Sequence, residues 1–162
     1  RIAEVAKKIK RDFYINVQGD EPICNPKDIK KIIKHAKKNP NQVINGFTEI
    51  KDKKQFYSPN IPKVVFDNDY NLMYMSRSAI PSNKKKQLIK AWRQVCIYSF
   101  SYKSLKNYTS VLKKTNLESI EDLESIRFLE LGYKVKMLKM SNKSVAVDTK
   151  EDLLKVRKLV KR

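Results

Sequence analysis

Glycine, cysteine, histidine and tryptophan are scarce in this sequence: three, two, one and one among 162 residues. The two cysteines, Cys24 and Cys96, stand far apart without CxxC spacing, so neither a zinc site nor a disulfide framework is indicated. We therefore expect a reducing, cytoplasmic location. No apolar run approaches the length of a membrane span, so we expect no membrane partner.

Acidic residues are also few beside basic ones, 17 Asp and Glu against 36 Lys and Arg, which gives a net charge of +19. Such an excess is typical of nucleic-acid-binding proteins. Here the charge is mostly lysine scattered over every segment, whereas base recognition favours arginine. We expect no nucleic-acid partner, and a basic nucleic-acid-binding module stays open only as an alternative. The electrostatic field of this positive net charge could also attract anionic nucleotides.

Apolar residues, 41% of the total, recur along the whole chain and are enough for one domain over residues 1–162. Their periodicity alternates between helix and strand. Helices are predicted at 2–9, 26–38, 102–113, 120–131 and after 149, and strands at 13–17, 43–50, 63–66, 72–75, 94–100 and 135–140. This alternation predicts an α/β sandwich of three layers with a mixed, mainly parallel sheet.

Capping residues support several of these boundaries. Asn25 is a predicted N-cap with Pro26 at the first helical position, and Gly132 is predicted to end the helix over 120–131. Thr149 is predicted to cap the last helix, with Asp152 three residues on. The predicted inner face of that last helix comprises Leu153, Val156 and Val160.

The first segment that could bind a ligand or take part in a reaction is VQGDEP at residues 17–22, where a predicted buried strand is followed by a polar turn. In open α/β sheets, ligands bind outside the carboxyl ends of strands. Gly19 would let the backbone approach a ligand closely, and Asp20 is a hard oxygen ligand suited to Mg²⁺. An ordinary strand-to-helix turn accounts for this segment equally well.

A second carboxylate, Asp148, directly precedes a helix start. Its charge also suits the helix dipole, and taken alone that is the better interpretation. Two distant carboxylates, each at the end of a strand, could instead meet at the sheet edge and hold one cation.

Arg77 follows the strand at 72–75 and could grip a carboxylate or phosphate with two parallel hydrogen bonds. An isolated arginine more often forms a surface ion pair. Glu118, Glu121 and Glu124 share roughly one helix face, which is usually solvated, and Arg127 could pair with Glu124.

The order of these segments is more specific than any one of them. VQGDEP at 17–22, KVV at 63–65 with LMYMSRSAIP at 72–81, IY at 97–98, LESIEDLESIR at 117–127 and VDTKEDL at 147–153 together resemble 3-deoxy-manno-octulosonate cytidylyltransferases over the whole chain. The resemblance implies a Rossmann-like, nucleotide-diphospho-sugar-transferase-like fold. It also implies Mg²⁺-dependent coupling of CTP to a 2-keto sugar acid, for lipopolysaccharide or capsule synthesis, by a homodimer.

The resemblance also implies roles for particular residues. Asp20 and Asp148 correspond to the catalytic aspartates that hold the metal. The residues implied to bind substrate are Gln18, Gly19, Arg77, Gln94, Tyr98, Glu124 and Ser125.

Departures from the family cluster on the sugar side, where the family has His at position 94 and Gln at position 125. We interpret this as retained metal chemistry with an octulosonate or a modified relative as the sugar. The chain resembles the C-terminal two-thirds of the family domain and lacks its glycine- and arginine-rich CTP-binding loop. We therefore expect the 162 residues alone to be inactive, and an inactive remnant of the same fold stays open as an alternative.

Overall fold

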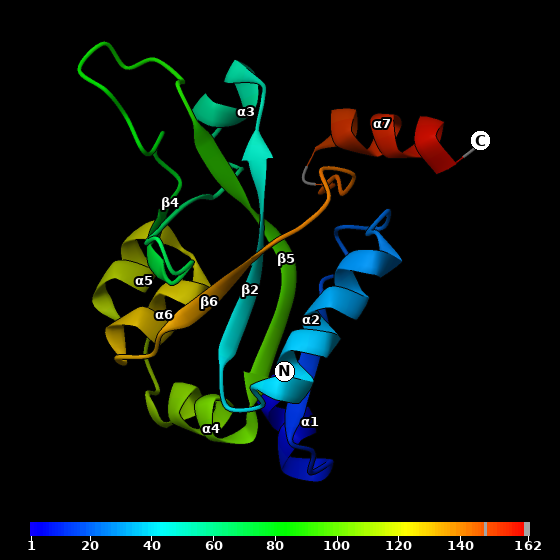
Figure 1. The fold of residues 1–162 in the computed structure, drawn as a ribbon, viewed down its shortest axis with the longest axis vertical. Coiled ribbons are helices and arrows are strands. Elements are labelled where there is room, and N and C mark those ends of the chain that lie inside the picture. The colour runs from blue at the N-terminus through cyan, green and yellow to red at the C-terminus, as the bar shows by residue number, and fades with distance from the viewer. Residues whose placement is uncertain (148, 161–162) are drawn as a thin grey trace.

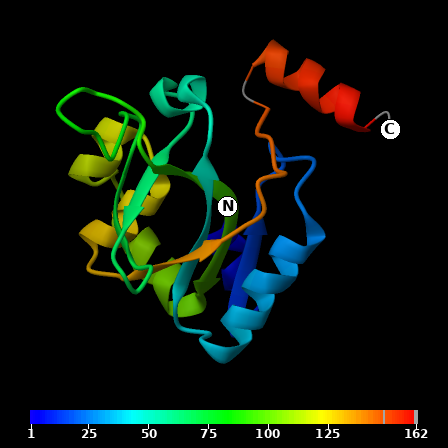
Figure 2. The same ribbon diagram turned by 45° about the horizontal axis from the view of Figure 1, so that its top comes forward.

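A single sheet organises the chain in the computed structural model, which describes residues 1–147 and 149–160. Its strands lie in the order β4-β3-β5-β2-β6, with β1 paired to β5 (Figures 1 and 2). The strands are β1 (Phe13–Val17), β2 (Val43–Ile50), β3 (Lys63–Phe66), β4 (Leu72–Ser76), β5 (Ala91–Ser101) and β6 (Val135–Lys139). The helices are α1 (Ile2–Lys8), α2 (Pro26–Lys38), α3 (Lys53–Tyr57), α4 (Tyr102–Ser110), α5 (Asn116–Glu121), α6 (Glu124–Glu130) and α7 (Lys150–Val160).

The long strand β5 is the hub of this sheet. It pairs antiparallel with β1, β2 and β3, and β3 pairs antiparallel with β4. Among the described residues only β2 and β6 pair in parallel. The mixed sheet is thus confirmed, but the expectation that this part of it is mainly parallel was wrong, because β5 runs against every strand that it touches.

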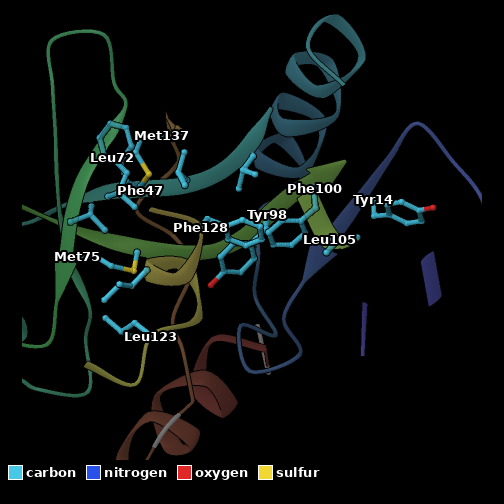
Figure 3. Close-up of a cluster of buried hydrophobic side chains, with 14 of the residues drawn as sticks. Tyr14, Phe47, Leu72, Met75, Tyr98, Phe100, Leu105, Leu123, Phe128 and Met137 are labelled. Atoms are coloured by element: carbon cyan, nitrogen blue, oxygen red, sulfur yellow. The ribbon is translucent and has the colours of Figure 1, made fainter. Parts of the chain in front are cut away.

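The sheet is covered on both faces, which confirms the three-layer α/β sandwich. On one face α2 packs Ile32 and Ala36 against Val95 and Ile97 of β5. The opposite face carries the larger core, to which α1, α4 and α6 contribute (Figure 3). Labelled members of that core in Figure 3 include Tyr14, Phe47, Phe100, Leu105 and Phe128. Side chains that alternate along β5 point to opposite faces of the sheet and so pack into the two helical layers.

Local capping chemistry explains several boundaries. The Asn25 side chain accepts a hydrogen bond from the Lys27 amide, with Pro26 in the first helical turn, as predicted. Gly132 has φ +79°, so it takes the left-handed conformation that favours glycine after a helix. The Thr149 hydroxyl accepts from the Asp152 amide, and the Asp152 carboxylate accepts from the Thr149 amide.

The helix predicted over 120–131 is two helices, so that prediction was wrong. α5 ends at Asp122, whose left-handed conformation (φ 51°) turns the chain, and α6 begins after Leu123. Aspartate tolerates this conformation better than most residues. The break buries Leu123, and it allows α5 and α6 to pack together.

The prediction of which residues of the last helix are buried was also wrong in part. Val156 is the buried residue of α7, whereas Leu153 and Val160 are 39% and 65% exposed. Figures 1 and 2 show why: α7 lies beyond the end of β6 and does not cover a face of the sheet. No helix in the described part of the chain is long and apolar enough to cross a membrane.

Candidate active site

A pocket of about 830 Å³ opens where β1 ends and the polar face of β5 begins. Its wall also includes the start of α6, the segment after β4, residues 144–146 and the first turns of α7. Residues between 52 and 62, in and around α3, and residues of α4 and α5 line it as well. Of the residues predicted to bind substrate or metal, the pocket brings together Gln18, Asp20, Arg77, Gln94, Tyr98, Glu124 and Ser125. Gly19 lies in the same turn, where a Cβ would meet no atom within 4 Å. Asp148 lies outside the described residues.

The Asp20 turn lies directly beside the segment that leads to residue 148. The Gln18 amide continues the β1–β5 pairing by donating to the Cys96 carbonyl at 3.2 Å. Two residues later, the Asp20 carbonyl accepts a hydrogen bond from the Val147 amide at 2.9 Å. Two regions more than a hundred positions apart are therefore joined backbone to backbone at the pocket.

The exposed Asp20 carboxylate is suited to a metal. It lines the pocket and forms no ion pair with any described residue. Within the described residues no group of three His, Cys, Asp or Glu could hold an ion. Mg²⁺ needs no such group, since it is usually bound by one or two carboxylates together with substrate phosphates and water.

Glu21 is a pocket residue that the sequence did not reveal. Its side chain is only 3% exposed, and its Oε1 accepts from the Cys96 amide at 3.2 Å. Burial raises the pKa of this carboxyl, against the lowering effects of the Cys96 amide and of the Arg93 charge. Arg93 in turn donates to the Ser144 carbonyl at 2.8 Å. This buried group lies beneath the Asp20 turn and next to the 144–147 segment.

The polar face of β5 presents Gln94, Cys96 and Tyr98 to the pocket. Burial raises the pKa of the Cys96 thiol to about 12 and that of the Tyr98 hydroxyl well above its usual value. Both groups are therefore neutral near pH 7. Tyr98 offers the pocket a hydroxyl, not a phenolate.

Arg77 is placed in the pocket wall by hydrogen bonds to main-chain carbonyls. Its Nε donates to the Glu121 carbonyl at 2.7 Å, and its Nη atoms donate to the Pro59 and Asp122 carbonyls. The Glu121 carboxylate accepts from the Arg77 amide at 2.9 Å and from the Ser76 hydroxyl at 2.6 Å. Three of the five guanidinium N–H groups thus hold the side chain in place, and its predicted role toward the sugar stays a prediction.

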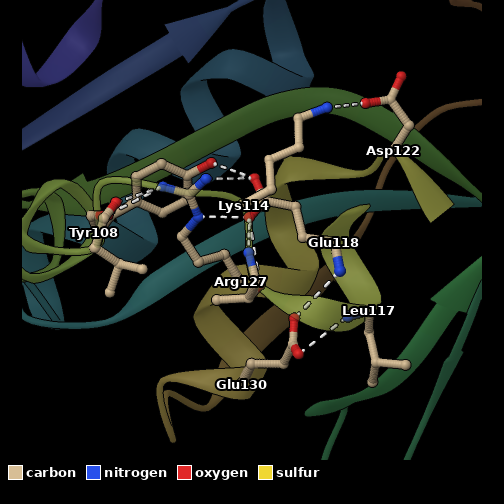
Figure 4. Close-up of polar contacts among 9 residues, drawn as sticks. Tyr108, Lys114, Leu117, Glu118, Asp122, Arg127 and Glu130 are labelled. Atoms are coloured by element: carbon tan, nitrogen blue, oxygen red, sulfur yellow. Dashed lines mark hydrogen bonds and ion pairs between the residues drawn. The ribbon is translucent and has the colours of Figure 1, made fainter. Parts of the chain in front are cut away.

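The prediction that Arg127 pairs with Glu124 was wrong. Arg127 pairs with Glu118, at 2.5 Å from Nε to Oε2 and 2.9 Å from Nη2 to Oε1 (Figure 4). Glu118 is 1% exposed, so it is no solvated side chain, and it also accepts from the Tyr108 hydroxyl. The turn between α5 and α6 makes this contact possible, because it carries Arg127 back across α5. Glu124 is left exposed at the pocket.

Known proteins share this α/β fold. A solved structure described as CMP:2-keto-3-deoxy-manno-octonic acid synthetase complexed with CTP superposes with a TM-score of 0.88 and 30% identity, covering 99% of this chain and 66% of that one. The family described as Cytidylyltransferase matches residues 1–150. The chain belongs to this cytidylyltransferase family.

Two curated relatives indicate where in the family it lies. A 3-deoxy-manno-octulosonate cytidylyltransferase of Fusobacterium nucleatum is 36% identical over 163 residues, 99% of this chain. An 8-amino-3,8-dideoxy-manno-octulosonate cytidylyltransferase of Shewanella halifaxensis is 34% identical over 144 residues, 88% of this chain. The chain spans 66% and 58% of the length of these relatives.

Proposed function

We propose that the complete protein transfers CMP from CTP to a 2-keto-3-deoxy sugar acid and releases pyrophosphate. The sugar acid is 3-deoxy-manno-octulosonate or its 8-amino-3,8-dideoxy relative, the substrates in the names of the two relatives. The observation that carries the proposal is the convergence of seven predicted site residues on one pocket, with Asp20 joined through Val147 to the segment before Asp148.

In this reaction the anomeric hydroxyl oxygen of the sugar acid bonds to the α-phosphorus of CTP. The bond from that phosphorus to the pyrophosphate oxygen breaks, and the hydroxyl proton is lost to solvent. Asp20 and Asp148 would hold Mg²⁺, which neutralises phosphate charge and orients the reactants when bound. The hydrogen bond from the Val147 amide to the Asp20 carbonyl joins the two segments before substrate arrives.

Cationic side chains suit the pocket to two anionic substrates. Lys54, Arg77, Lys114 and Lys155 lie in its wall together with the buried Arg93. Carboxylates line the same wall, and Lys114 and Lys155 pair with Asp122 and Asp152, so these cations would act as separate contacts to phosphate or carboxylate groups and not as one positive field. The neutral Tyr98 hydroxyl and the Gln18 amide can then bind oxygen atoms of the sugar or nucleotide.

The test is a ³¹P NMR assay of the complete natural polypeptide with CTP, Mg²⁺ and each sugar acid. We expect equal formation of a phosphodiester and of pyrophosphate, loss of both on chelation of the metal, and weak use of UTP or ATP. Absence of any CMP-sugar with both acids, while CTP binds, would favour the inactive remnant instead. A steep loss of DNA binding with rising salt would favour the nucleic-acid alternative.

Further proposals follow from the family. About a third of the residues of the Fusobacterium nucleatum relative lie outside the part that this chain matches, so we expect the 162 residues alone to give no CMP transfer in the same assay. A homodimer is expected in sedimentation experiments. The free thiols of Cys24 and Cys96 support a cytoplasmic location, where surface polysaccharide precursors would be activated.

A further inference from the structure

A chain of hydrogen bonds fixes the orientation of the Gln94 amide. It begins at the bulge in β2, where the side chain of Asn45 is fully buried. The Asn45 Nδ2 donates to the Val95 and Ile97 carbonyls, at 3.1 and 3.2 Å. Main-chain carbonyls only accept hydrogen bonds, so Asn45 must direct its nitrogen toward β5 and its Oδ1 away from it.

Asn45 in turn orients Gln94. The Asn45 Oδ1 lies 3.1 Å from the Gln94 Nε2, and an amide oxygen requires a donor there. The same nitrogen lies 3.0 Å from the Tyr98 hydroxyl and 3.5 Å from the Ser125 hydroxyl. The Nε2 group of Gln94 is therefore taken up by acceptor oxygen atoms of the protein itself.

The other end of the amide, Oε1, is available to a ligand. Among the described residues no donor bonds to it, and it is not one of the enclosed side-chain atoms that lack a partner. Gln94 lies within 3.5 Å of the Ser125 hydroxyl, and the exposed Glu124, which precedes Ser125 in the chain, lines the same pocket. At this part of the wall, a fixed amide oxygen and a carboxylate both accept hydrogen bonds.

We infer that Gln94 contacts the C8 substituent of the bound sugar acid, and that it is a specificity-determining residue that favours an amino group there over a hydroxyl. The inference rests on the proposed function. A primary amine is protonated near neutral pH, and it can donate to Gln94 Oε1 while the charge of Glu124 attracts it. A hydroxyl in its place can donate only once and carries no charge, and hydrogen bonds to charged groups are about twice as strong as neutral ones.

The experiment measures kcat/KM of the complete protein for 8-amino-3,8-dideoxy-manno-octulosonate and for 3-deoxy-manno-octulosonate, each with CTP and Mg²⁺. We expect the ratio of amino to hydroxyl substrate to exceed one in the wild type. In Gln94→Met, which keeps the length of the side chain and removes its acceptor, the ratio should fall by roughly tenfold. Gln42→Met is the matched control on an exposed glutamine hydrogen-bonded to His35, and it should leave the ratio unchanged.

The ratio compares two substrates on one preparation, so loss of folded enzyme does not change it. If Gln94→Met has no measurable activity, Gln94→Asn, which withdraws the same amide by one methylene group, replaces it with the same expected fall. A wild-type preference for the hydroxyl substrate, or an unchanged ratio in the variants, would overturn the inference while leaving cytidylyl transfer intact. No transfer to either acid by the wild type would instead refute the proposed function.

Discussion

Replacement of Arg127 by methionine should destabilise the fold by about 3–5 kcal/mol, because it leaves the Glu118 carboxylate buried without its cation. Glu118 is 1% exposed and receives two hydrogen bonds from Arg127, at 2.5 and 2.9 Å. Arg127 also donates to the Tyr108 carbonyl at 3.2 Å, so α4, α5 and α6 all lose a contact. For a chain of this size, such a loss lowers the midpoint of thermal unfolding by on the order of 10 °C.

The assay is urea unfolding followed by circular dichroism, with a double-mutant cycle that adds Glu118→Gln. The double variant should recover part of the loss, since it removes the unpaired charge as well. Lys114→Met is the matched control: it removes a cation from an exposed pair with Asp122 and should change little. Equal effects of Arg127→Met and Lys114→Met, or strict additivity in the cycle, would refute a buried, coupled pair.

Two further predictions concern stability. Lys63 is fully buried, and its pKa is lowered from 10.5 to about 8, mainly by burial. As the pH rises, the folded protein therefore loses the Lys63 proton before the unfolded chain does, and the free energy of unfolding should rise between about pH 8 and 10.5. Chemical unfolding across this range should show a smaller rise in Lys63→Met, and identical pH profiles would contradict it. Gly46→Ala would place a Cβ 3.0 Å from Met140 Cγ and 3.2 Å from Val95 atoms, and should cost about 1–3 kcal/mol in urea unfolding. Gly19→Ala, with nothing within 4 Å, should be near neutral, and similar losses in both variants would contradict the packing argument.

Much of the fold follows from local sequence signals. The Asn25 cap, the Thr149 cap and Gly132 act within a few residues, so their chemistry is visible in the sequence. The pocket residues were placed together by resemblance, because neither periodicity nor spacing alone brings Gln18, Arg77 and Ser125 into one cavity.

What the sequence could not show depends on contacts between distant segments. The helical pattern continues through Asp122, and only the packing of α5 against α6 explains the break there. The Glu118–Arg127 pair needs that break, since residues nine apart do not face each other on one straight helix. Glu21 is buried because the Cys96 amide and Arg93 meet it from β5, and no local signal announces such a contact.

The direct test of the account is whether one metal ion is close to both Asp20 and Asp148. Mn²⁺ added with CTP to the ¹⁵N-labelled complete protein broadens the amide signals of nearby residues. We predict that the amides of Gly19–Glu21 and of 147–149 broaden together at the same Mn²⁺ concentration, and that both effects are lost in Asp20→Asn and also in Asp148→Asn but retained in the surface control Asp12→Asn. Broadening of one segment without the other, or undiminished broadening in either Asp20→Asn or Asp148→Asn, would contradict a shared metal site.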